Sequence, residues 1–525
     1  MLESAAPEPE EQIIELQATL LELERQLLER SAQVQSYEQR IRILEEALRV
    51  MQADRYGASR EKLGEAPGQR SLFNEVEALM DTAKAVDFEP ELTATPLREN
   101  PTPKGKPGRK ALAAHLPRVE VRYELPEIER ICGCGAALKE FDVETCEQLD
   151  YVPAKIRVIR HVKAKYACAC CHGTVKVAAM PPQVLPRTNA SPGLLAQVAT
   201  SKYVDGMPLY RLETVAARHG VHLPRATQAA WMIALVEPLQ PVMNLMDERA
   251  RTFGYVRIDE TPLQVLKSEK PATAEHWMWV RVTGPRRERL ILFDYDASRS
   301  SQVAERLLEG CHGYVQSDGY AAYDAVAVRL KLTHVGCMAH ARRRFFEAIE
   351  ALPHSERKQE TAAHEMVRRI DALYAIEREI KALTPEARTQ VRRERALPLL
   401  DALIERAHAL QNQTLPSGKL GEALAYLTKQ WPKLVRYIED GRLAIDTNLA
   451  ENAIRPFARG RRAWLFADTV SGAKASAMFF SLVETAKANG LEPYAYLRRL
   501  FERLPRAKTV ADYEALLPFA TFAEN

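Results

Sequence analysis

Apolar residues recur at alternating spacings of three and four along the N-terminal part of the chain. One set of these positions consists of Ile13, Leu20, Leu27, Val34, Ile41 and Leu48, and the other of Leu16, Leu23, Arg30, Tyr37, Leu44 and Met51. A heptad repeat of this length without Gly or Pro is typical of a coiled coil, which would join two copies of the chain. A single amphipathic helix packed on its own domain would give the same pattern.

A different period begins at Gly254, where alternating apolar residues predict a buried strand over residues 254–266. The pattern that follows predicts strands at 277–283 and 290–295, a helix at 299–308, a strand at 313–317, a helix, a strand at 332–336 and a helix at 340–352. Three antiparallel strands followed by alternating helices and strands is the order of a ribonuclease-H-like fold.

Helical periodicity dominates two other regions. Residues 209–219 and 224–235 predict two helices around a short turn at Gly220, which fits a helix-turn-helix or two ordinary packed helices. In the first case, the second helix would present polar side chains at an exposed start, namely Arg225, Thr227 and Gln228. Residues 355–440 are charged and lack strand signals, so we expect an all-helical insertion within the ribonuclease-H-like core.

Length and charge limit the class of protein only broadly. The chain has 525 residues and a formal net charge of +3, so several compact units are expected and local clusters of charge matter more than the total. No apolar run is long enough to cross a membrane, and the acidic start MLESAAPEPEEQ does not resemble a secretory signal. We therefore expect a cytoplasmic protein without a membrane partner.

Cysteines cluster in one region of the chain. Six of the 8 lie between Cys132 and Cys171, which in a reducing compartment favours metal binding over disulfides. Two thiol-rich turns, CGCG and CACCH, frame a strand-like stretch, as in a zinc ribbon that holds Zn²⁺ through four thiolates. We predict a structural zinc ion bound by Cys132, Cys134, Cys168 and Cys171. Free thiols remain the alternative, and the open substitutes as ligands are Cys146, Cys170 and His172.

Two groups of basic residues suit contact with nucleic-acid phosphates. The Pro- and Gly-rich tether PTPKGKPGRK carries Lys104, Lys106, Arg109 and Lys110, and a solvated linker is its alternative reading. The second group follows Glu451 without an acid until Asp468, and consists of Arg455, Arg459, Arg461 and Arg462.

Two acidic residues, Asp259 and Glu260, occupy the middle of the first predicted strand of the core. A carboxylate there needs a compensating partner, because burial of an unpaired charge is costly. Asp259 could cap a turn at a strand end, or it could bind a divalent cation. In a ribonuclease-H-like layout the middle of the first strand lies beside the end of the fourth, which would bring Asp259 to Asp318. Two converging carboxylates repel unless a cation joins them.

Glu451 falls in the first turn of another predicted helix, which Asp446 or Thr447 can cap. A basic run beside a lone Glu suits a helix that supplies one more metal carboxylate while it contacts phosphates. Compensation of the helix dipole is the alternative role for Glu451.

Several blocks of the chain, taken together, identify a family resemblance. They are RYGASREKL, CEQLDYVPAKIRVIRHVKAKYAC, YVRIDETPLQVL, QSDGYAAYD, GCMAHARRRFFEA and DTNLAENAIRPFARGRRAWLFADTVSGAKASAMFFSLVETAKANGLEPYAYL. In this order they resemble the DDE transposases of insertion-sequence family sixty-six, over nearly the whole chain. One departure is the pair Cys132 and Cys134, where the family more often has a gap of two residues.

The resemblance implies a bacterial, nucleoid-associated transposase that cuts and joins DNA strands at the ends of an insertion sequence. Asp259, Asp318 and Glu451 would be its catalytic carboxylates and would hold two Mg²⁺ or Mn²⁺ ions. Water would attack in cleavage, and the freed 3′-hydroxyl would then attack target DNA. The implied partners are double-stranded DNA, at least one further copy of the chain and small accessory transposition proteins.

Two alternative functions use the same residues: a ribonuclease-H-fold nuclease without strand transfer, and a catalytically silent DNA-bridging protein. We expect Cys337 and His340 to position the helix that follows them rather than to form a second metal site. The acids nearby that we assign to solvated or structural roles are Asp294, Asp296 and Asp324.

The predicted fold class is a multidomain α+β protein. Its expected segments are a coiled coil (1–55), a linker with the basic tether (56–125), a zinc ribbon (126–180), a helical DNA-binding region with a helix-turn-helix (185–248), the ribonuclease-H-like core in two parts (249–354 and 441–485), the helical insertion between them (355–440) and a C-terminal helical region (486–525).

Overall fold

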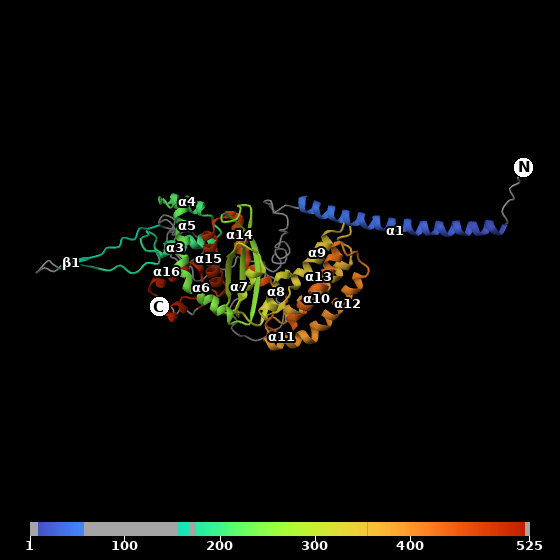
Figure 1. The fold of residues 1–525 in the computed structure, drawn as a ribbon. Helices are drawn as coiled ribbons and strands as arrows, with labels where there is room; N and C mark the ends of the chain where they lie inside the picture. Colours follow the sequence, from blue (N-terminus) through green and yellow to red (C-terminus); the bar gives the residue numbers. More distant parts are fainter. Residues whose placement is uncertain (1–8, 57–155, 168–174, 354, 520–525) are drawn as a thin grey trace, which may run out of the picture. The chain divides into compact units, whose positions relative to one another are not determined.

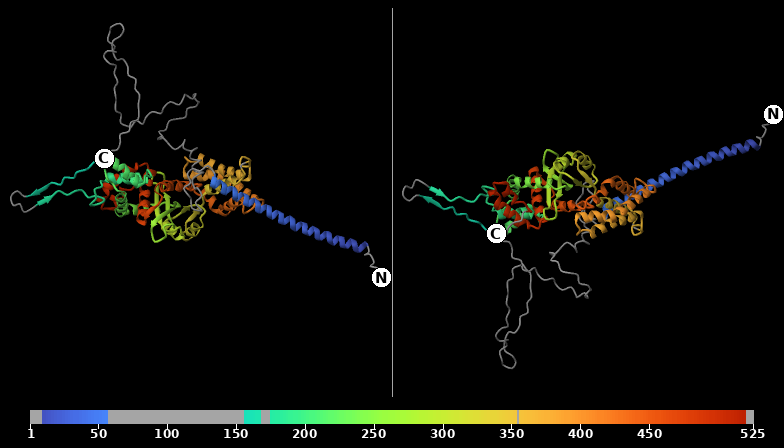
Figure 2. Two further views of the ribbon diagram at one scale, coloured as in Figure 1. Left: turned by 90° about the horizontal axis from the view of Figure 1, so that it is seen from above. Right: turned by 90° about the horizontal axis from the view of Figure 1, so that it is seen from below.

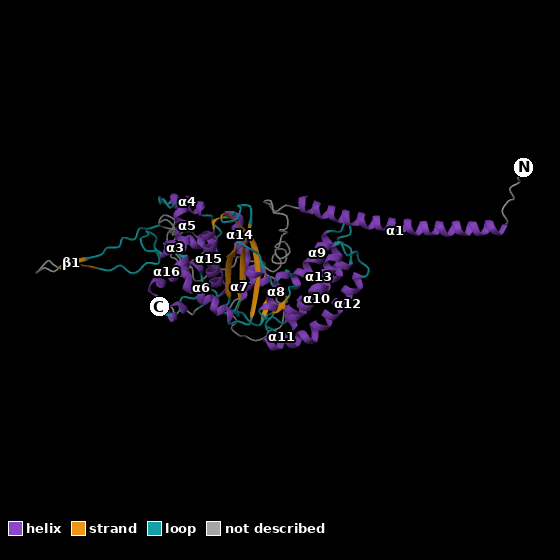
Figure 3. Ribbon diagram, in the orientation of Figure 1, coloured by secondary structure: helices purple, strands orange, loops and turns teal. Residues whose placement is uncertain are grey.

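The computed structural model describes residues 9–56, 156–167, 175–353 and 355–519. They form a mixed α+β structure, with one mixed sheet among many helices (Figures 1 and 3). The chain divides into two compact units, one of Met1–Arg70 with Lys163–Asn525 and one of Ser71–Val162. Every helix in the described ranges is too short or too polar to span a lipid bilayer.

The N-terminal heptad pattern forms one continuous helix, α1 (Pro9–Tyr56), which confirms the predicted helix. Its apolar heptad side chains are exposed in the single chain, including Leu20, Leu23, Leu27, Val34, Ile41, Leu44 and Leu48. A row of exposed leucines at heptad spacing is the surface that a second helix would cover. The pairing of two such helices stays a prediction.

A short antiparallel hairpin follows in the described part, formed by β1 (Lys165–Ala167) and β2 (Val175–Val177). The four predicted zinc ligands and the basic tether lie outside the described residues.

A central sheet has the strand order β5-β4-β3-β6-β7, and β8 pairs with the far end of β3. The strands are β3 (Tyr255–Lys267), β4 (Glu275–Thr283), β5 (Leu290–Asp296), β6 (Tyr314–Gln316), β7 (Thr333–Val335) and β8 (Ala467–Thr469). Pairs β3–β4 and β4–β5 are antiparallel, whereas β3–β6, β6–β7 and β3–β8 are parallel. The first five strands agree with the predicted ranges within two residues. Strand β8 was not predicted, because three residues are too few to show a period.

Helices cover both faces of this sheet (Figure 1). Leu263 and Val265 of β3 join the large apolar cluster that includes residues of α6, α14 and α15. Val256 and Ile258 instead pack in a second cluster with residues of α7 and α8. Since successive side chains of a strand point to opposite faces, odd-numbered residues of β3 face α14 and even-numbered residues face α7 and α8. The helices named here are α6 (Val236–Arg251), α7 (Ser301–Leu308), α8 (Ala321–Arg329), α14 (Asn448–Trp464) and α15 (Val470–Ala488).

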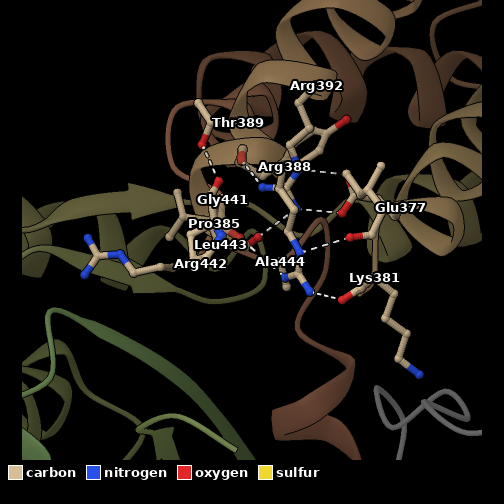
Figure 4. Close-up of polar contacts among 12 residues, drawn as sticks. Glu377, Lys381, Pro385, Arg388, Thr389, Arg392, Gly441, Arg442, Leu443 and Ala444 are labelled. Carbon is tan, nitrogen blue, oxygen red and sulfur yellow. Dashed lines mark hydrogen bonds and ion pairs between the residues drawn. The ribbon is translucent and has the colours of Figure 1, made fainter. Parts of the chain in front are cut away.

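The stretch between α9 (Met338–Glu350) and α14 is helical throughout, as the sequence predicts, and has its own apolar core. The helices of this insertion lie together in two further views (Figure 2). They are α10 (Ala362–Glu379), α11 (Pro385–Val391), the π-helical turn η2 (Arg392–Ala396), α12 (Leu397–Gln411), α13 (Lys419–Leu434) and the 3₁₀ turn η3 (Val435–Ile438). Arg392 connects the π-helical turn to the segment before α14 (Figure 4).

The region before the core contains α3 (Pro192–Tyr203), α4 (Leu209–Arg218) and α5 (Arg225–Ala234), and the chain closes with α16 (Pro493–Arg503), the 3₁₀ turn η4 (Leu504–Arg506) and α17 (Val510–Glu514). The pair α4 and α5 confirms the two helices predicted around Gly220, which has a positive φ of 73°. The expectation that Gln228 is exposed is wrong. Its side chain is fully buried and donates to the carbonyl of Leu223 at 2.9 Å, because it closes the turn between the helices.

Candidate active site

Asp259 and Glu260 are neighbours on β3 and therefore point to opposite faces of the sheet. Glu260 faces α8, where its carboxylate accepts a hydrogen bond from the Tyr323 hydroxyl. The other oxygen of Glu260 lies 2.7 Å from both Nε and Nη2 of Arg299. Asp259 points toward the α14 side. The alternation of the strand thus separates two adjacent carboxylates into two environments.

Glu260 is held in a packed polar cluster. Its side chain is 2% exposed, and the guanidinium of its partner Arg299 lies over the rings of Trp277 and Tyr320, at 4.9 and 4.3 Å from their centres. Burial raises the pKa of Glu260, and the positive charge of Arg299 opposes that rise. These contacts provide hydrogen-bond donors to both oxygens of Glu260.

Asp318 follows the end of β6, the strand that runs parallel to β3. The register pairs Arg257 with Gln316, so that two residues further along Asp318 comes beside Asp259, as the sequence analysis expected. The carboxylate of Asp318 accepts a hydrogen bond from the backbone N–H of Tyr320 at 3.0 Å. A Cβ at the intervening Gly319 would lie 2.7 Å from the Tyr426 hydroxyl, so a larger residue there would displace the Tyr426 side chain.

Glu451 lies in the first turn of α14 and is 1% exposed. Asp446 accepts the backbone N–H of Asn448 at 3.1 Å and so caps the helix, whereas Thr447 makes no capping bond through its side chain. The Thr447 hydroxyl instead lies 3.3 Å from Oε1 of Glu451. The start of α14 therefore fixes Glu451 toward the β3 side of the core.

The three carboxylates form one electrostatic cluster. Burial, followed by the negative charges of Glu260, Glu451 and Asp318, raises the pKa of Asp259 well above its usual value, and His340 opposes that rise. Oδ2 of Asp259 and Oε2 of Glu451 are buried and have no hydrogen-bond partner among the described residues. Buried polar atoms are normally satisfied, so orphaned carboxylate oxygens in a like-charged cluster fit the oxygen ligands of divalent cations.

Three further groups, from the start of α9, lie close to Glu451 or to its neighbour Thr447. Sγ of Cys337 accepts hydrogen bonds from the backbone N–H and hydroxyl of Thr447, at 3.3 and 3.2 Å. Burial, with the nearby charge of Glu451, raises the pKa of the Cys337 thiol to about 12. Nδ1 of His340 lies 3.8 Å from Oε1 of Glu451, and Nη2 of Arg343 lies 3.8 Å from Oε2.

The four arginines that follow Glu451 lie in different environments. Arg455 is 5% exposed, and Arg461 donates to the backbone carbonyl of Pro262 in β3. Arg459 and Arg462 are exposed on α14. Arg225, at the start of α5, is exposed as well. Periodicity alone did not distinguish these inward and outward positions, and DNA binding by any of them stays a prediction.

Three acidic residues predicted to be solvated or structural, Asp294, Asp296 and Asp324, lie in ion pairs with basic side chains. Asp294 accepts from Arg281 at 3.0 Å, and Asp296 accepts from Arg306 at 2.9 Å. Asp324 lies 2.9 Å from Nζ of Lys433.

Comparison with known families gives matches along most of the chain. Residues 187–475 match the profile of the Transposase IS66 family, and residues 481–519 match the IS66 C-terminal element. Residues 129–172 match the zinc-finger binding domain of transposase IS66, which supports a structural zinc ion. Residues 43–121 match a profile described as Transposase C of IS166 homeodomain.

Similar proteins occur in Sinorhizobium fredii (strain NBRC 101917 / NGR234). The uncharacterized protein y4jD is 31% identical over 422 residues, which cover 78% of this chain and 81% of that protein. The uncharacterized protein y4qI is 30% identical over 484 residues, which cover 89% of this chain and 87% of that protein.

Proposed function

Because this chain belongs to the IS66 transposase family, we propose that it cuts and joins DNA strands at the ends of an insertion sequence. The observation that carries this proposal is the convergence of Asp259, Asp318 and Glu451 from three separate segments, with two buried carboxylate oxygens that have no hydrogen-bond partner within the described ranges. A purely structural acidic cluster would be expected to satisfy these two oxygens with hydrogen-bond donors.

We propose that these three carboxylates hold divalent metal ions, with Mg²⁺ or Mn²⁺ as the cation. Bound there, such ions would supply a nucleophile at neutral pH and offset the charge on the leaving 3′ oxygen. The protein's own part is to hold the carboxylates in place through the β3–β6 register and the start of α14. No Ser or Tyr nucleophile is then required.

The arrangement of the core also supports a ribonuclease-H-like fold. Three antiparallel strands come first, the next two strands join the sheet in parallel, and helices cover both faces. Asp259 lies on β3, Asp318 follows the end of the neighbouring strand β6, and Glu451 lies in the first turn of α14. Exposed Arg459 and Arg462 on that helix are the best placed of the four arginines to contact phosphates.

A cleavage assay tests the enzyme class and the third carboxylate together. Wild-type protein with Mg²⁺ should cleave a labelled duplex that carries the element's end, and Glu451→Gln should lower the rate by more than about 1,000-fold. Glu422→Gln is the matched control, because Glu422 lies exposed on α13 in an ion pair with Lys419. Equal rates for wild type and Glu451→Gln would place the third ligand elsewhere.

The joining reaction needs its own assay. Incubation of the protein with pre-cleaved ends and a target plasmid should yield joined products that disappear in Asp259→Asn. Cleavage without joined products would identify a nuclease of the same fold. Binding of the ends without cleavage by any variant would favour a DNA-bridging protein.

A further inference from the structure

Three side chains of different chemistry meet where α9 and α14 begin. Sγ of Cys337, an imidazole nitrogen of His340 and a carboxylate oxygen of Glu451 all lie within 4.8 Å of one another. Cys337 and His340 come from one turn of chain at the start of α9, whereas Glu451 comes from the far side of the helical insertion. The cluster therefore exists only in the folded protein.

The polar atoms of this cluster lack ordinary partners. Nδ1 of His340 is buried and has no hydrogen-bond partner in the part of the chain that the structure describes, and it lies 3.8 Å from Oε1 of Glu451. The hydroxyl of Thr447 lies 3.2 Å from Sγ of Cys337 and 3.3 Å from Oε1 of Glu451. A hydroxyl has one hydrogen and can donate it to only one of these acceptors at a time. Buried atoms left in this state point to a ligand that the cluster would hold.

We propose that Cys337, His340 and Glu451 form a binding site for one thiophilic divalent cation, of which Zn²⁺ is the representative. A thiolate and a carboxylate would neutralise the two charges of the ion, and the imidazole would complete three protein ligands. Sulfur and nitrogen ligands favour Zn²⁺ over Mg²⁺, which prefers oxygen. The fourth position of a tetrahedral zinc site would stay open to water or to a phosphate oxygen.

The observed spacing requires only a small closure around an ion. Bonds of about 2.0–2.3 Å to a tetrahedral zinc ion place its ligand atoms about 3.5 Å apart. Nδ1 of His340 and Oε1 of Glu451 are already 3.8 Å apart. Arg343 approaches the other oxygen of Glu451, so Oε1 stays available to the site. Binding would release the proton of the Cys337 thiol, as metal coordination does for thiols in general.

The site shares Glu451 with the three carboxylates of the proposed catalytic centre, and this consequence rests on the proposed function. An ion held by Cys337 and His340 would draw Glu451 away from Asp259 and Asp318. Zn²⁺ would then inhibit the Mg²⁺-dependent cleavage reaction even though both ions are divalent.

Cobalt absorption tests the binding site without reference to activity. Full-length protein whose zinc finger is already loaded with Zn²⁺ is titrated with Co²⁺, and the near-ultraviolet charge-transfer band of a cobalt–thiolate bond is recorded. We expect wild type to bind one more Co²⁺ ion with this band than Cys337→Ser. Cys311→Ser is the matched control, because Cys311 and Cys337 are the free cysteines of the described residues. Equal spectra for wild type and a folded Cys337→Ser would overturn the proposal.

A second variant covers the case in which Cys337→Ser does not fold. His340→Gln keeps the thiol and its contact with Thr447, and should bind the additional Co²⁺ at least about 10-fold more weakly. An unchanged affinity in His340→Gln would also overturn the site.

A second experiment measures inhibition by Zn²⁺. The cleavage rate of each protein with added Zn²⁺ is compared with the rate of the same protein in Mg²⁺ alone. The Zn²⁺ concentration that halves cleavage should rise at least about 10-fold in His340→Gln relative to wild type and to Cys311→Ser. Equal inhibition of all three would refute the shared role of Glu451. An absence of cleavage in every protein, wild type included, would instead count against the proposed function, while the cobalt spectra would still decide the site.

Discussion

Asp259 and Glu260 carry the same functional group one residue apart, yet the fold gives them opposite roles. Glu260 faces Arg299 and Tyr323, which satisfy both of its oxygens. Asp259 faces other carboxylates, and its Oδ2 has no hydrogen-bond partner in the described part of the chain. The two-residue period of a strand is the physical cause of this difference.

Replacement of Asp259 by Asn should stabilise the protein in Mg²⁺-free buffer. The pKa of Asp259 is raised in the folded state, so the folded chain holds that proton more tightly than the unfolded chain. Stability from this group is therefore lost as pH rises from the unfolded pKa, about 3.9, through the folded pKa. Because Asn carries no charge, the free energy of unfolding of Asp259→Asn should exceed that of wild type by about 1 kcal/mol at neutral pH. The thermal midpoint should rise by about 2–4 °C.

Calorimetry of both proteins checks this expectation, in buffer free of strong chelators that would strip the zinc finger. Added Mg²⁺ should raise the midpoint of wild type more than that of Asp259→Asn, because ligands stabilise the state that binds them. A lower midpoint for Asp259→Asn than for wild type in Mg²⁺-free buffer would contradict the electrostatic argument.

The alternation of β3 makes a second prediction for the same pair of residues. Glu260→Gln should retain at least about a tenth of wild-type cleavage, because an amide still accepts from Arg299 and Glu260 faces away from Glu451. The cleavage rate of Asp259→Asn should be more than about 1,000-fold lower than that of wild type. Rates measured on one labelled duplex compare them directly, and equal losses in the two variants would show that both faces of the strand serve the reaction.

At the scale of elements, one buried arginine connects the helical insertion to the segment that leads into α14 (Figure 4). Arg392 begins the π-helical turn and is 1% exposed. It pairs with Glu377 at 2.6 Å and donates to the carbonyl oxygens of Tyr437 and Leu443 at 2.7 and 2.9 Å. The π-helical turn thus holds the backbone shortly before the cap of Glu451's helix.

Replacement of Arg392 by Met should destabilise the protein by about 3 kcal/mol or more, because it leaves the Glu377 charge and the carbonyl oxygens of Tyr437, Asp440 and Leu443 without their donor. The thermal midpoint should fall by at least about 6 °C. The control is Arg395→Met, since the pair of Arg395 with Glu379 is half exposed and should contribute at most about 1 kcal/mol. Similar thermal midpoints for the two variants would show that buried Arg392 stabilises the protein no more than exposed Arg395 does.

For the whole molecule, the exposed heptad residues of α1 predict a dimer or larger assembly. Leu27→Glu combined with Ile41→Glu places charges in the expected seam and should convert the protein to monomers in light scattering. Gln35→Glu combined with Gln39→Glu adds the same charge at heptad positions on the outer face of the helix and should leave the assembly intact. A monomeric wild type would refute self-association through α1.

Much of this architecture could be predicted because periodicity is a local property. The alternation in β3 and the helical pattern of α4 and α5 each depend on a short stretch of chain, and the structure places these elements close to the expected residues. The three residues of β8 carry no such pattern, so only their pairing with β3 reveals them as a strand.

Most helices and strands, the family and the list of candidate carboxylates can be read from the amino-acid sequence, because each follows from short-range pattern or from motif order. Three-dimensional packing was needed to show that Asp259 rather than Glu260 faces Glu451, that Gln228 is buried, and that Arg461 turns inward. It also brought Cys337 and His340 to Glu451 across the whole insertion. Such long-range contacts depend on how distant segments pack to bury their apolar faces, and no local periodicity in the sequence predicts them.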